Sequence, residues 1–387
     1  MKTNLNKIYL LIPILLIAWT EKSFTQELIP DWKFKTSGKV LASPLKVDNN
    51  IFIGDEKGIF YSINISTGEA NWQYETGGNI QARATKVGEN IFFESANTLY
   101  LLERKNGKLV WKYELEMEPF VFKYQDKEWP YKIDPYDDKR SIGLLNDGII
   151  FIGCGNGKLL GFNAKNGQVV KEYSSDGNSP IRSSPYIQEG KIFFGDWNGV
   201  VYCYSIKDDN LVWKKKTYRV ERPYPTFGGV VSEFTSYKGL LYFGARNHML
   251  NVLATDSGDK DWTFTDKQGG WMIGDPVVFS DTLYMGGSDN FSMKAFDPIW
   301  GRNIWSYRKE KMNIYTKPVV NDDWVIYTAG DAYNGNEPGM LILLDRKSGK
   351  ELATYEVPMG SFSSPILVNQ SVLFGCYDGH VYSIKIE

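Results

Sequence analysis

The sequence contains few of the residues on which many enzyme classes depend. It has two histidines, three cysteines and a formal net charge of −2 over 387 residues. Two isolated histidines offer no zinc-binding spacing, and the four oxygen donors of loop 330–339 miss the calcium-loop signature. A nucleic-acid partner would need a basic face, which this charge does not supply. The sequence therefore predicts neither a metal site nor binding to nucleic acid.

The three cysteines form no evident disulfide framework. Cys154 and Cys376 each follow an apolar strand in different repeats, and Cys203 lies inside a strand. Three free, buried thiols are the simplest interpretation. A disulfide between Cys154 and Cys203, in neighbouring repeats, is the alternative.

Long apolar runs are also absent, apart from one at the N-terminus. Residues 8–19 are mostly apolar, follow two lysines and precede a short polar stretch, which is typical of a secretory signal peptide over residues 1–25. The run is shorter than the roughly 18–20 residues that a membrane anchor needs. No cysteine follows it for lipid attachment. We therefore expect an exported, soluble monomer, periplasmic or extracellular, with one domain over residues 26–387.

One pattern does occur, and it is repeated eight times along the chain. Each copy has an apolar strand that closes on a small residue, such as IFIG at 51–54 or LYMG at 283–286. A second alternating strand, a turn that usually ends in Gly, and an aromatic residue follow. Apolar residues alternate with period two, and turns rich in Gly, Asn and Asp separate the strands. Units of four strands at this spacing predict an all-β fold, an eight-bladed β-propeller.

We expect the recurring aromatic residue to fill the gap between adjacent blades. Burial of such a side chain is worth roughly 3 kcal/mol or more. Most copies carry tryptophan, and two carry tyrosine at a less regular spacing. The predicted inter-blade aromatics are Trp32, Trp72, Trp111, Tyr173, Trp213, Trp262, Trp305 and Tyr355.

The two ends of the chain complement one another. The last copy stops after three strands, whereas residues 30–38, PDWKFKTSG, contain a strand with a tryptophan and no earlier strand of its blade. We therefore expect Trp32 to lie in a strand that completes the eighth blade. Closing the ring in this way removes exposed strand edges.

The repeated pattern, Gly-x-x-Tyr-x-Ile/Leu and then Thr/Asn-Gly-x-x-x-Trp, with Ser-Pro at 43–44, 184–185 and 364–365, resembles the PQQ-like repeat. The resemblance covers residues 30–387 and implies the eight-bladed fold of quinoprotein alcohol dehydrogenases and BamB-like outer-membrane assembly factors. Those dehydrogenases hold PQQ beside a disulfide between adjacent cysteines and a calcium ion. This chain has no adjacent cysteines. Together with the chain's size, the resemblance implies a non-catalytic, BamB-like scaffold without a cofactor.

The strand order predicts which face of the disc carries function. In an antiparallel blade, the turns after the first and third strands share one face, and the remaining connections share the other. We call these the short-turn face and the long-loop face, because all the long insertions fall on the second. Loops on a rigid scaffold often carry binding sites. We therefore expect a protein partner in the cell envelope to bind the long-loop face.

Aromatic and basic side chains in three insertions are candidates for that interface, because both types are enriched in binding hot spots. The candidate partner-binding residues are Phe120, Tyr124, Trp129, Tyr131, Tyr136, Arg219, Arg222 and Trp271. Alternatively, the rings pack on the blades and the basic groups are only solvated. The same rings would suit a glycan, so a glycan-binding or glycan-cleaving propeller is a further alternative.

The central funnel is the second candidate site. Charged side chains near the start of the innermost strands should converge there. They are Arg83, Arg140, Arg182, Asp275 and Lys317. Such a cluster would suit an anionic ligand, or it would form salt bridges between blades. A small dehydrogenase that uses PQQ and calcium is the alternative function for such a funnel.

Overall fold

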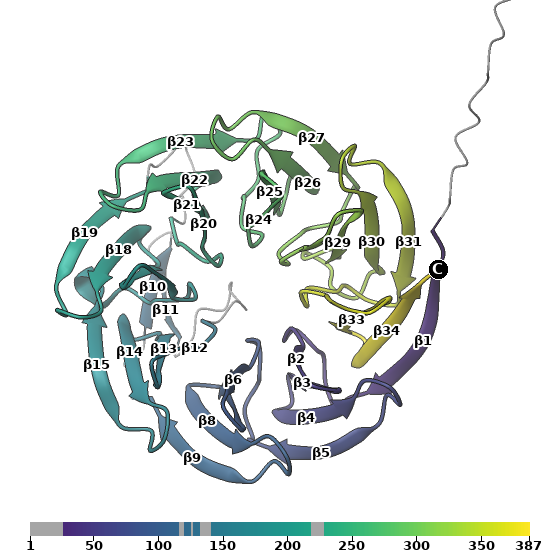
Figure 1. The fold of residues 1–387 in the computed structure, drawn as a ribbon, viewed down its shortest axis with the longest axis horizontal. Coiled ribbons are helices and arrows are strands. Elements are labelled where there is room, and N and C mark those ends of the chain that lie inside the picture. The colour runs from purple at the N-terminus through teal and green to yellow at the C-terminus, as the bar shows by residue number, and fades with distance from the viewer. Residues whose placement is uncertain (1–25, 116–119, 125–126, 132–140, 218–227) are drawn as a thin grey trace, which may run out of the picture.

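The computed structural model describes residues 26–115, 120–124, 127–131, 141–217 and 228–387. Eight four-stranded antiparallel sheets surround a central axis (Figure 1), which confirms the predicted eight-bladed propeller. A 3₁₀ turn at Asp176–Asn178 is the only helical element among these residues. Within the described ranges, no helix is long and apolar enough to cross a membrane.

The blades follow one another along the chain, and each runs outward from the axis in strand order. Blades 1 to 4 are β2–β5 (Leu45–Val47, Asn50–Gly54, Ile59–Asn64, Ala70–Glu75), β6–β9 (Thr85–Val87, Asn90–Ser95, Thr98–Glu103, Leu109–Glu114), β12–β15 (Leu144–Asn146, Ile149–Gly153, Lys158–Asn163, Val169–Ser174) and β16–β19 (Tyr186–Gln188, Lys191–Gly195, Val200–Ser205, Leu211–Lys216). Blades 5 to 7 are β20–β23 (Thr235–Tyr237, Leu240–Ala245, Met249–Ala254, Lys260–Thr265), β24–β27 (Val277–Phe279, Thr282–Gly286, Ser292–Phe296, Asn303–Arg308) and β28–β31 (Val319–Val320, Trp324–Ala329, Gly339–Asp345, Glu351–Val357). Blade 8 combines β32–β34 (Ile366–Val368, Ser371–Cys376, His380–Ile386) with β1 (Leu28–Lys35).

The last blade joins the two ends of the chain, as the sequence predicts. Strand β1 pairs antiparallel with β34, from Leu28 opposite Ile386 to Lys35 opposite His380. Figure 1 shows these strands, purple and yellow, side by side. Backbone hydrogen bonds between Glu27 and Glu387, at 2.9 and 3.0 Å, extend the ladder. The ring is therefore closed by main-chain pairing between its termini.

The hydrophobic core lies between blades. The second and third strands of blade 1 are buried almost throughout, whereas its outermost strand alternates between exposed and half-buried residues. Phe60 of blade 1 stacks on Phe93 of blade 2, with ring centroids 3.9 Å apart. Each middle strand has one neighbouring blade on either face. Because both faces are therefore buried, its apolar residues form a nearly continuous run.

A contact between neighbouring blades is here called a seam, and in six of the eight seams the tryptophan of one blade packs on the next blade. The indole nitrogen of Trp72 donates a hydrogen bond to the Arg104 carbonyl at 3.0 Å. A Cβ atom on Gly107 would lie 2.6 Å from the Trp72 ring, and Gly107 has a φ of +72°. Both facts require glycine there. Trp32, Trp111, Trp213, Trp262 and Trp305 repeat this arrangement.

The Gly and the Trp of one repeat thus pack in two different seams. Gly107 receives the tryptophan of blade 1, and Trp111, four residues later, packs on Gly167 of blade 3. In a repeat that has both residues, the Trp therefore packs on the next blade and the Gly receives the Trp of the preceding blade.

The predicted positions of Tyr173 and Tyr355 are corrected by the strand register. Both tyrosines pack in seams, but neither occupies the tryptophan position. Trp111 lies opposite Leu101, and the equivalent residues in blades 3 and 7 are Lys171, opposite Gly161, and Ala353, opposite Leu343. The aromatic spacing in the sequence misled because a second aromatic often follows two residues after the tryptophan.

Each seam without a tryptophan has a receiving turn without glycine. In blade 4, Asp209 replaces the glycine, with a φ of +55°. Lys171 donates to the Ile206 carbonyl at 3.1 Å and to Asp209 at 2.6 Å, and the Tyr173 hydroxyl donates to Asp209 at 2.9 Å. In blade 8 that turn does not exist, because the chain termini take its place. There, Ala353 and Leu28 pack against the same hydrophobic cluster.

All three cysteines are free and buried, so the Cys154–Cys203 disulfide does not form. Burial raises the pKa of the Cys203 and Cys376 thiols to about 12 and shifts that of Cys154 further upward. Because the thiolate is the reactive form, the native protein should not react with Ellman's reagent near pH ~8, whereas unfolded protein should release three equivalents. A thiol that reacts rapidly in the native protein would contradict this expectation.

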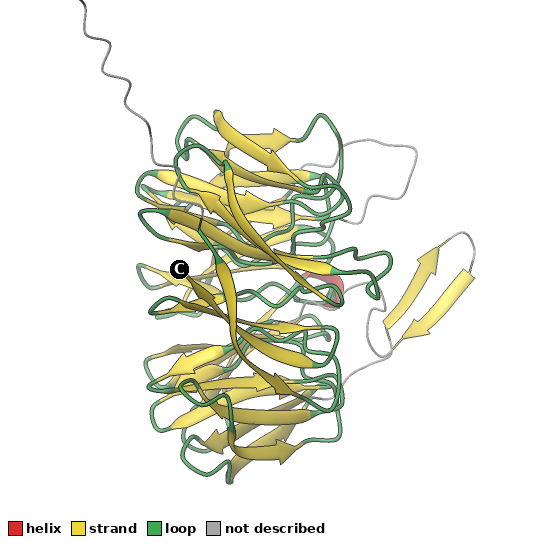
Figure 2. Cartoon of the chain, turned by 90° about the vertical axis from the view of Figure 1, so that its right-hand side faces the viewer, coloured by secondary structure: helices red, strands yellow, loops and turns green. Residues whose placement is uncertain are grey.

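The two faces of the disc differ as the topology predicts. Figure 2 shows the C-terminus on one face and the strands β10 (Phe120–Tyr124) and β11 (Lys127–Tyr131) projecting from the other. This hairpin belongs to the connection between blades 2 and 3, on the long-loop face. Its strands pair only with each other.

Candidate functional site: the central funnel

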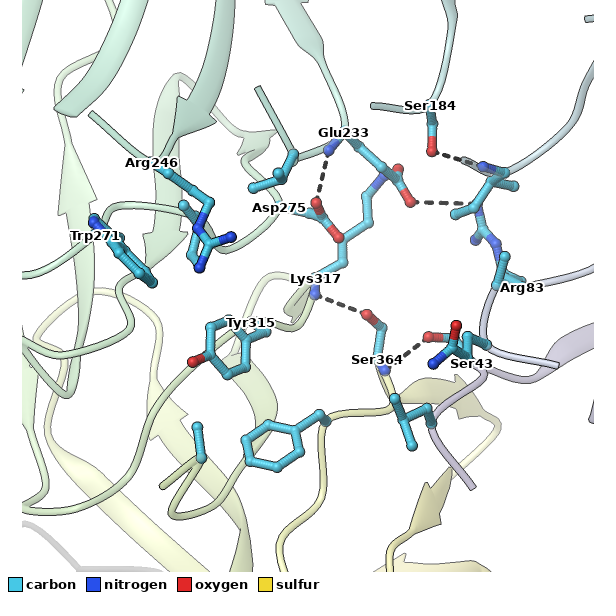
Figure 3. A pocket seen from close by; sticks show the side chains of 18 of the residues that line it. Ser43, Arg83, Ser184, Glu233, Arg246, Trp271, Asp275, Tyr315, Lys317 and Ser364 are labelled. Atoms are coloured by element: carbon cyan, nitrogen blue, oxygen red, sulfur yellow. Dashed lines mark hydrogen bonds and ion pairs between the residues drawn. The ribbon is translucent and has the colours of Figure 1, made fainter. Parts of the chain in front are cut away.

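A cavity of about 230 Å³ opens around the propeller axis (Figure 3). All eight blades line it, through the segments just before their innermost strands. Three turns between second and third strands add Arg246, Ala332 and Tyr377. Both kinds of segment belong to the long-loop face, so the cavity lies on that side of the disc.

One residue per blade forms a ring in the cavity wall. Each stands two positions before its innermost strand. The eight ring residues are Ser43, Arg83, Ile142, Ser184, Glu233, Asp275, Lys317 and Ser364. Proline follows the ring residue in most blades. Because the residue before proline is restricted to extended backbone, this sequence limits the backbone conformation at those ring positions.

Hydrogen bonds connect ring residues of neighbouring blades. The backbone N–H of Ser364 donates to Ser43 Oγ at 2.8 Å, and that of Lys317 donates to Ser364 Oγ at 2.9 Å. The N–H of Glu233 donates to Asp275 Oδ1 at 2.7 Å. The serine of each Ser-Pro pair, and Asp275 in the same position, therefore accept a backbone hydrogen bond from the preceding blade.

Glu233 connects three blades across the funnel. Its carboxylate accepts a hydrogen bond from Lys317 Nζ at 2.5 Å and lies 3.8 Å from Arg83 Nη2. These partners belong to blades 7 and 2, whereas Glu233 precedes blade 5. Its side chain is 15% exposed, against 35% for each cation. The ion pairs expected between blades therefore form through a residue that sequence reasoning missed, although it shares the ring position of both cations.

A stack of arginine and tryptophan side chains forms one wall. The Arg246 guanidinium carbon lies 4.2 Å from the Trp271 ring centroid and 5.1 Å from that of Trp197. Arg182 lies 5.5 Å from the Trp197 ring. Arg246 and Arg182 are only 5% and 6% exposed. Cation–π contact of this kind is strongest where the cation is desolvated.

Not all of the predicted funnel residues lie in the cavity wall. Arg83, Asp275 and Lys317 line the cavity, and so does Trp271, which was predicted to bind a partner. Arg182 is packed against Trp197 and is not among the lining residues.

The other predicted partner-binding and funnel residues belong to the long insertions. Arg140, Tyr136, Arg219 and Arg222 lie outside the described residues. Phe120, Tyr124, Trp129 and Tyr131 belong to the hairpin, which the structure describes through its backbone.

Arg246 and Trp197 are functional candidates that sequence reasoning missed. They come from turns between second and third strands. The only sequence signal for Arg246 is its position two residues before His248, in a turn of the long-loop face.

The oxygen donors of the funnel do not match a calcium–quinone site. Glu233 and Asp275 are its two carboxylates, and each is engaged as described above. Across the described ranges, no group of three or more His, Cys, Asp or Glu side chains could hold a metal ion. In loop 330–339, the Asp331 carboxylate accepts the backbone N–H groups of Tyr333 and Asn334. That loop therefore uses its oxygens to hold its own turn.

The eight equivalent blades, the shared ring position and the Trp–Gly seams define a propeller of PQQ-like repeats. The model of the family described as "Outer membrane protein assembly factor BamB" matches residues 30–121, 138–233 and 198–387. The chain belongs to this family.

Individual relatives are distant. Identity to BamB from Salmonella typhimurium is 22% over 193 residues, 48% of this chain and 46% of the relative. Identity to tetrathionate hydrolase from Acidithiobacillus ferrooxidans is 26% over 285 residues, 68% of this chain and 52% of the relative. The matches thus span about half the length of these curated relatives.

Solved structures agree with the fold. BamB from Moraxella catarrhalis superposes with a TM-score of 0.68 at 13% identity, covering 93% of this chain and 98% of that one. A europium-containing methanol dehydrogenase gives 0.72 at 12% identity, covering 92% and 93%. Because BamB and a methanol dehydrogenase superpose on this chain with similar TM-scores, this likeness establishes the fold alone.

Proposed function

We propose that the protein is an exported, non-catalytic scaffold that binds a protein partner in the cell envelope and acts in outer-membrane protein assembly. The family to which the chain belongs supports this role, as does the signal-peptide pattern of residues 1–25. The proposal requires no cofactor. The long-loop face is the proposed binding surface, with Tyr136, Arg219 and Arg222 as contributors from its connections.

The hairpin β10–β11 is the observation that carries the proposal. Phe122 pairs with Trp129, and Phe120 with Tyr131, so the two strands are rich in aromatic residues. The hairpin projects from the long-loop face and pairs with no blade (Figure 2). A two-stranded hairpin alone is only marginally stable in water. Its open edges could accept a strand from a partner, which would stabilise both.

Site-specific photo-crosslinking in cells tests this role. A benzoylphenylalanine in place of Trp129 should crosslink to one defined envelope protein. The matched control replaces Trp300, which is 82% exposed and lies in a turn of the short-turn face. That position should give no such product, because it faces away from the hairpin. Trp129→Ala should in turn weaken co-purification of the crosslinked protein, while Trp300→Ala should not.

Three outcomes would contradict the proposal. The first is an identical crosslinking pattern at the two positions. The second is alcohol-dependent dye reduction by the purified protein with PQQ and calcium, which would indicate a quinoprotein dehydrogenase. The third is specific binding or cleavage of an envelope glycan with no protein partner, which would favour the glycan alternative.

A further inference from the structure

The charges around the funnel do not balance. Arg83, Lys317 and Arg246 supply three positive charges to the cavity wall, and Glu233 and Asp275 supply two negative charges. The Glu233 carboxylate already bridges Lys317 and Arg83. Counted over the described residues, the cavity wall therefore carries one more positive than negative charge.

Arg182 adds a second buried guanidinium behind that wall. It is 6% exposed, its guanidinium carbon lies 5.5 Å from the Trp197 ring centroid, and its Nε makes no hydrogen bond within the described part of the chain. No carboxylate of the described residues forms a salt bridge with it. A buried cation destabilises a protein unless a negative charge lies near it. Two buried guanidinium groups, both near the Trp197 ring, thus create a positive potential at this side of the cavity.

Another part of the wall is aromatic. Tyr315 packs against Phe362 at 5.3 Å between ring centroids, and Phe362 against Tyr377 at 5.1 Å. Figure 3 shows Tyr315 near Arg246 and Trp271. Apolar walls lower the local dielectric and strengthen any ion pair formed inside. Such walls would also hold a short carbon chain.

We propose that the funnel is a carboxylate-binding site, in which Arg246 binds the oxyanion and the aromatic rings contact its carbon skeleton. The planar guanidinium suits bidentate binding of a carboxylate, and Trp197 and Trp271 fix its orientation. The cavity, at about 230 Å³, is the size for a small acid or one acidic side chain. The carboxylate is either a free small dicarboxylate or an acidic side chain of a partner. Only the second source rests on the proposed function.

Calorimetric titration of the purified chain tests the site with matched probes. Succinate should bind, whereas succinamide, which has the same shape without charge, should bind at least about tenfold more weakly. A capped Gly-Glu-Gly peptide, compared with capped Gly-Gln-Gly, tests a side chain as the source. Binding of succinate alone assigns a free acid, and binding of the Glu peptide alone assigns a partner side chain.

Variants localise the binding. Arg246→Gln should lower the affinity for the acid by at least about tenfold. Arg246→Lys keeps the charge but loses the planar guanidinium, and should lower the affinity by less. The matched control is Arg346→Gln on the short-turn face, where the guanidinium carbon lies 5.5 Å from the Phe279 ring. It should leave the affinity unchanged.

Several results would overturn the carboxylate site. Equal affinity for the charged and neutral probes in the unsubstituted chain would do so without any variant, which matters if Arg246→Gln fails to fold. Unchanged affinity in a folded Arg246→Gln variant would also overturn it. So would the absence of binding heat from every probe at about 10 mM, a concentration far above the dissociation constant of a specific site. Binding of succinate with no crosslink at position 129 would reject the proposed scaffold role and keep the site.

Discussion

Lys294→Ala is expected to lower the free energy of unfolding by roughly 3–5 kcal/mol, because it leaves a buried carboxylate without its counter-charge. Lys294 Nζ lies 2.7 Å from Asp266 Oδ2, and both side chains are 8% exposed. Asn290 also donates to that oxygen, at 3.1 Å. The pair connects blade 6 to the segment that follows blade 5. Urea denaturation followed by tryptophan fluorescence measures the change.

Two comparisons make the Lys294 experiment decisive. Lys214→Ala removes an ion pair to Asp176 whose side chains are 46% and 57% exposed, and should cost less than about 1 kcal/mol. Lys294→Met with Asp266→Leu removes both charges and should recover most of the lost stability. If Lys294→Ala cost no more than Lys214→Ala, the buried pair would not contribute as its geometry indicates.

Trp111→Ala is expected to cost roughly 3–5 kcal/mol, since it leaves a cavity in the seam between blades 2 and 3. Trp111 is 9% exposed, packs on Gly167 and donates to the Ala164 carbonyl at 3.1 Å. The matched change in the next seam is Lys171→Ala, which removes a part-exposed ion pair and should cost about 1 kcal/mol or less. Urea denaturation compares the two, and equal costs would contradict the role assigned to tryptophan.

The cost of Lys171→Ala should also depend on pH. The hydrogen bond from Lys171 lowers the pKa of Asp209 in the folded protein. A carboxyl group with a lowered pKa stabilises the folded state above its unfolded value, near 4, and loses this contribution as the pH falls. The difference between Lys171→Ala and the unsubstituted chain should therefore shrink in acid. The cost of Trp111→Ala should not change in this way.

The two seams without tryptophan lie opposite each other. One separates blades 3 and 4, near β15 and β19, and the other separates blades 7 and 8, near β31 and β1 (Figure 1). The ring therefore consists of two halves of four blades, each held by tryptophan seams. A seam built on an ion pair or on small apolar residues buries less surface than a tryptophan seam, so these two contacts are the weaker ones.

Some of the funnel was predictable, because the repeat places equivalent residues at equivalent depths. Arg83, Asp275 and Lys317 share one position in the repeat, and the structure puts all three in the cavity wall. Glu233 shares that position too, and a consistent alignment of the eight copies would have included it. Arg246 occupies a turn position that Trp197 fills in blade 4 and Tyr377 fills in blade 8, and each donates its backbone N–H to the segment before the innermost strand. Because the residue type at this position changes from blade to blade, the repeat does not point to arginine there.

The sequence by itself determined the number of blades, the closure of the ring through β1 and the face that carries the insertions. These properties follow from local periodicity and turn chemistry, which act over a few residues. Only the tertiary structure decided that the Gly and the Trp of one repeat pack in different seams. Each tryptophan of these seams donates its indole N–H to a carbonyl at least 32 residues later in the chain. The tertiary structure also decided that Glu233 crosses the axis to two blades and that Arg246 stacks between Trp197 and Trp271. Such contacts depend on how blades face one another across the ring, and no local pattern encodes that arrangement.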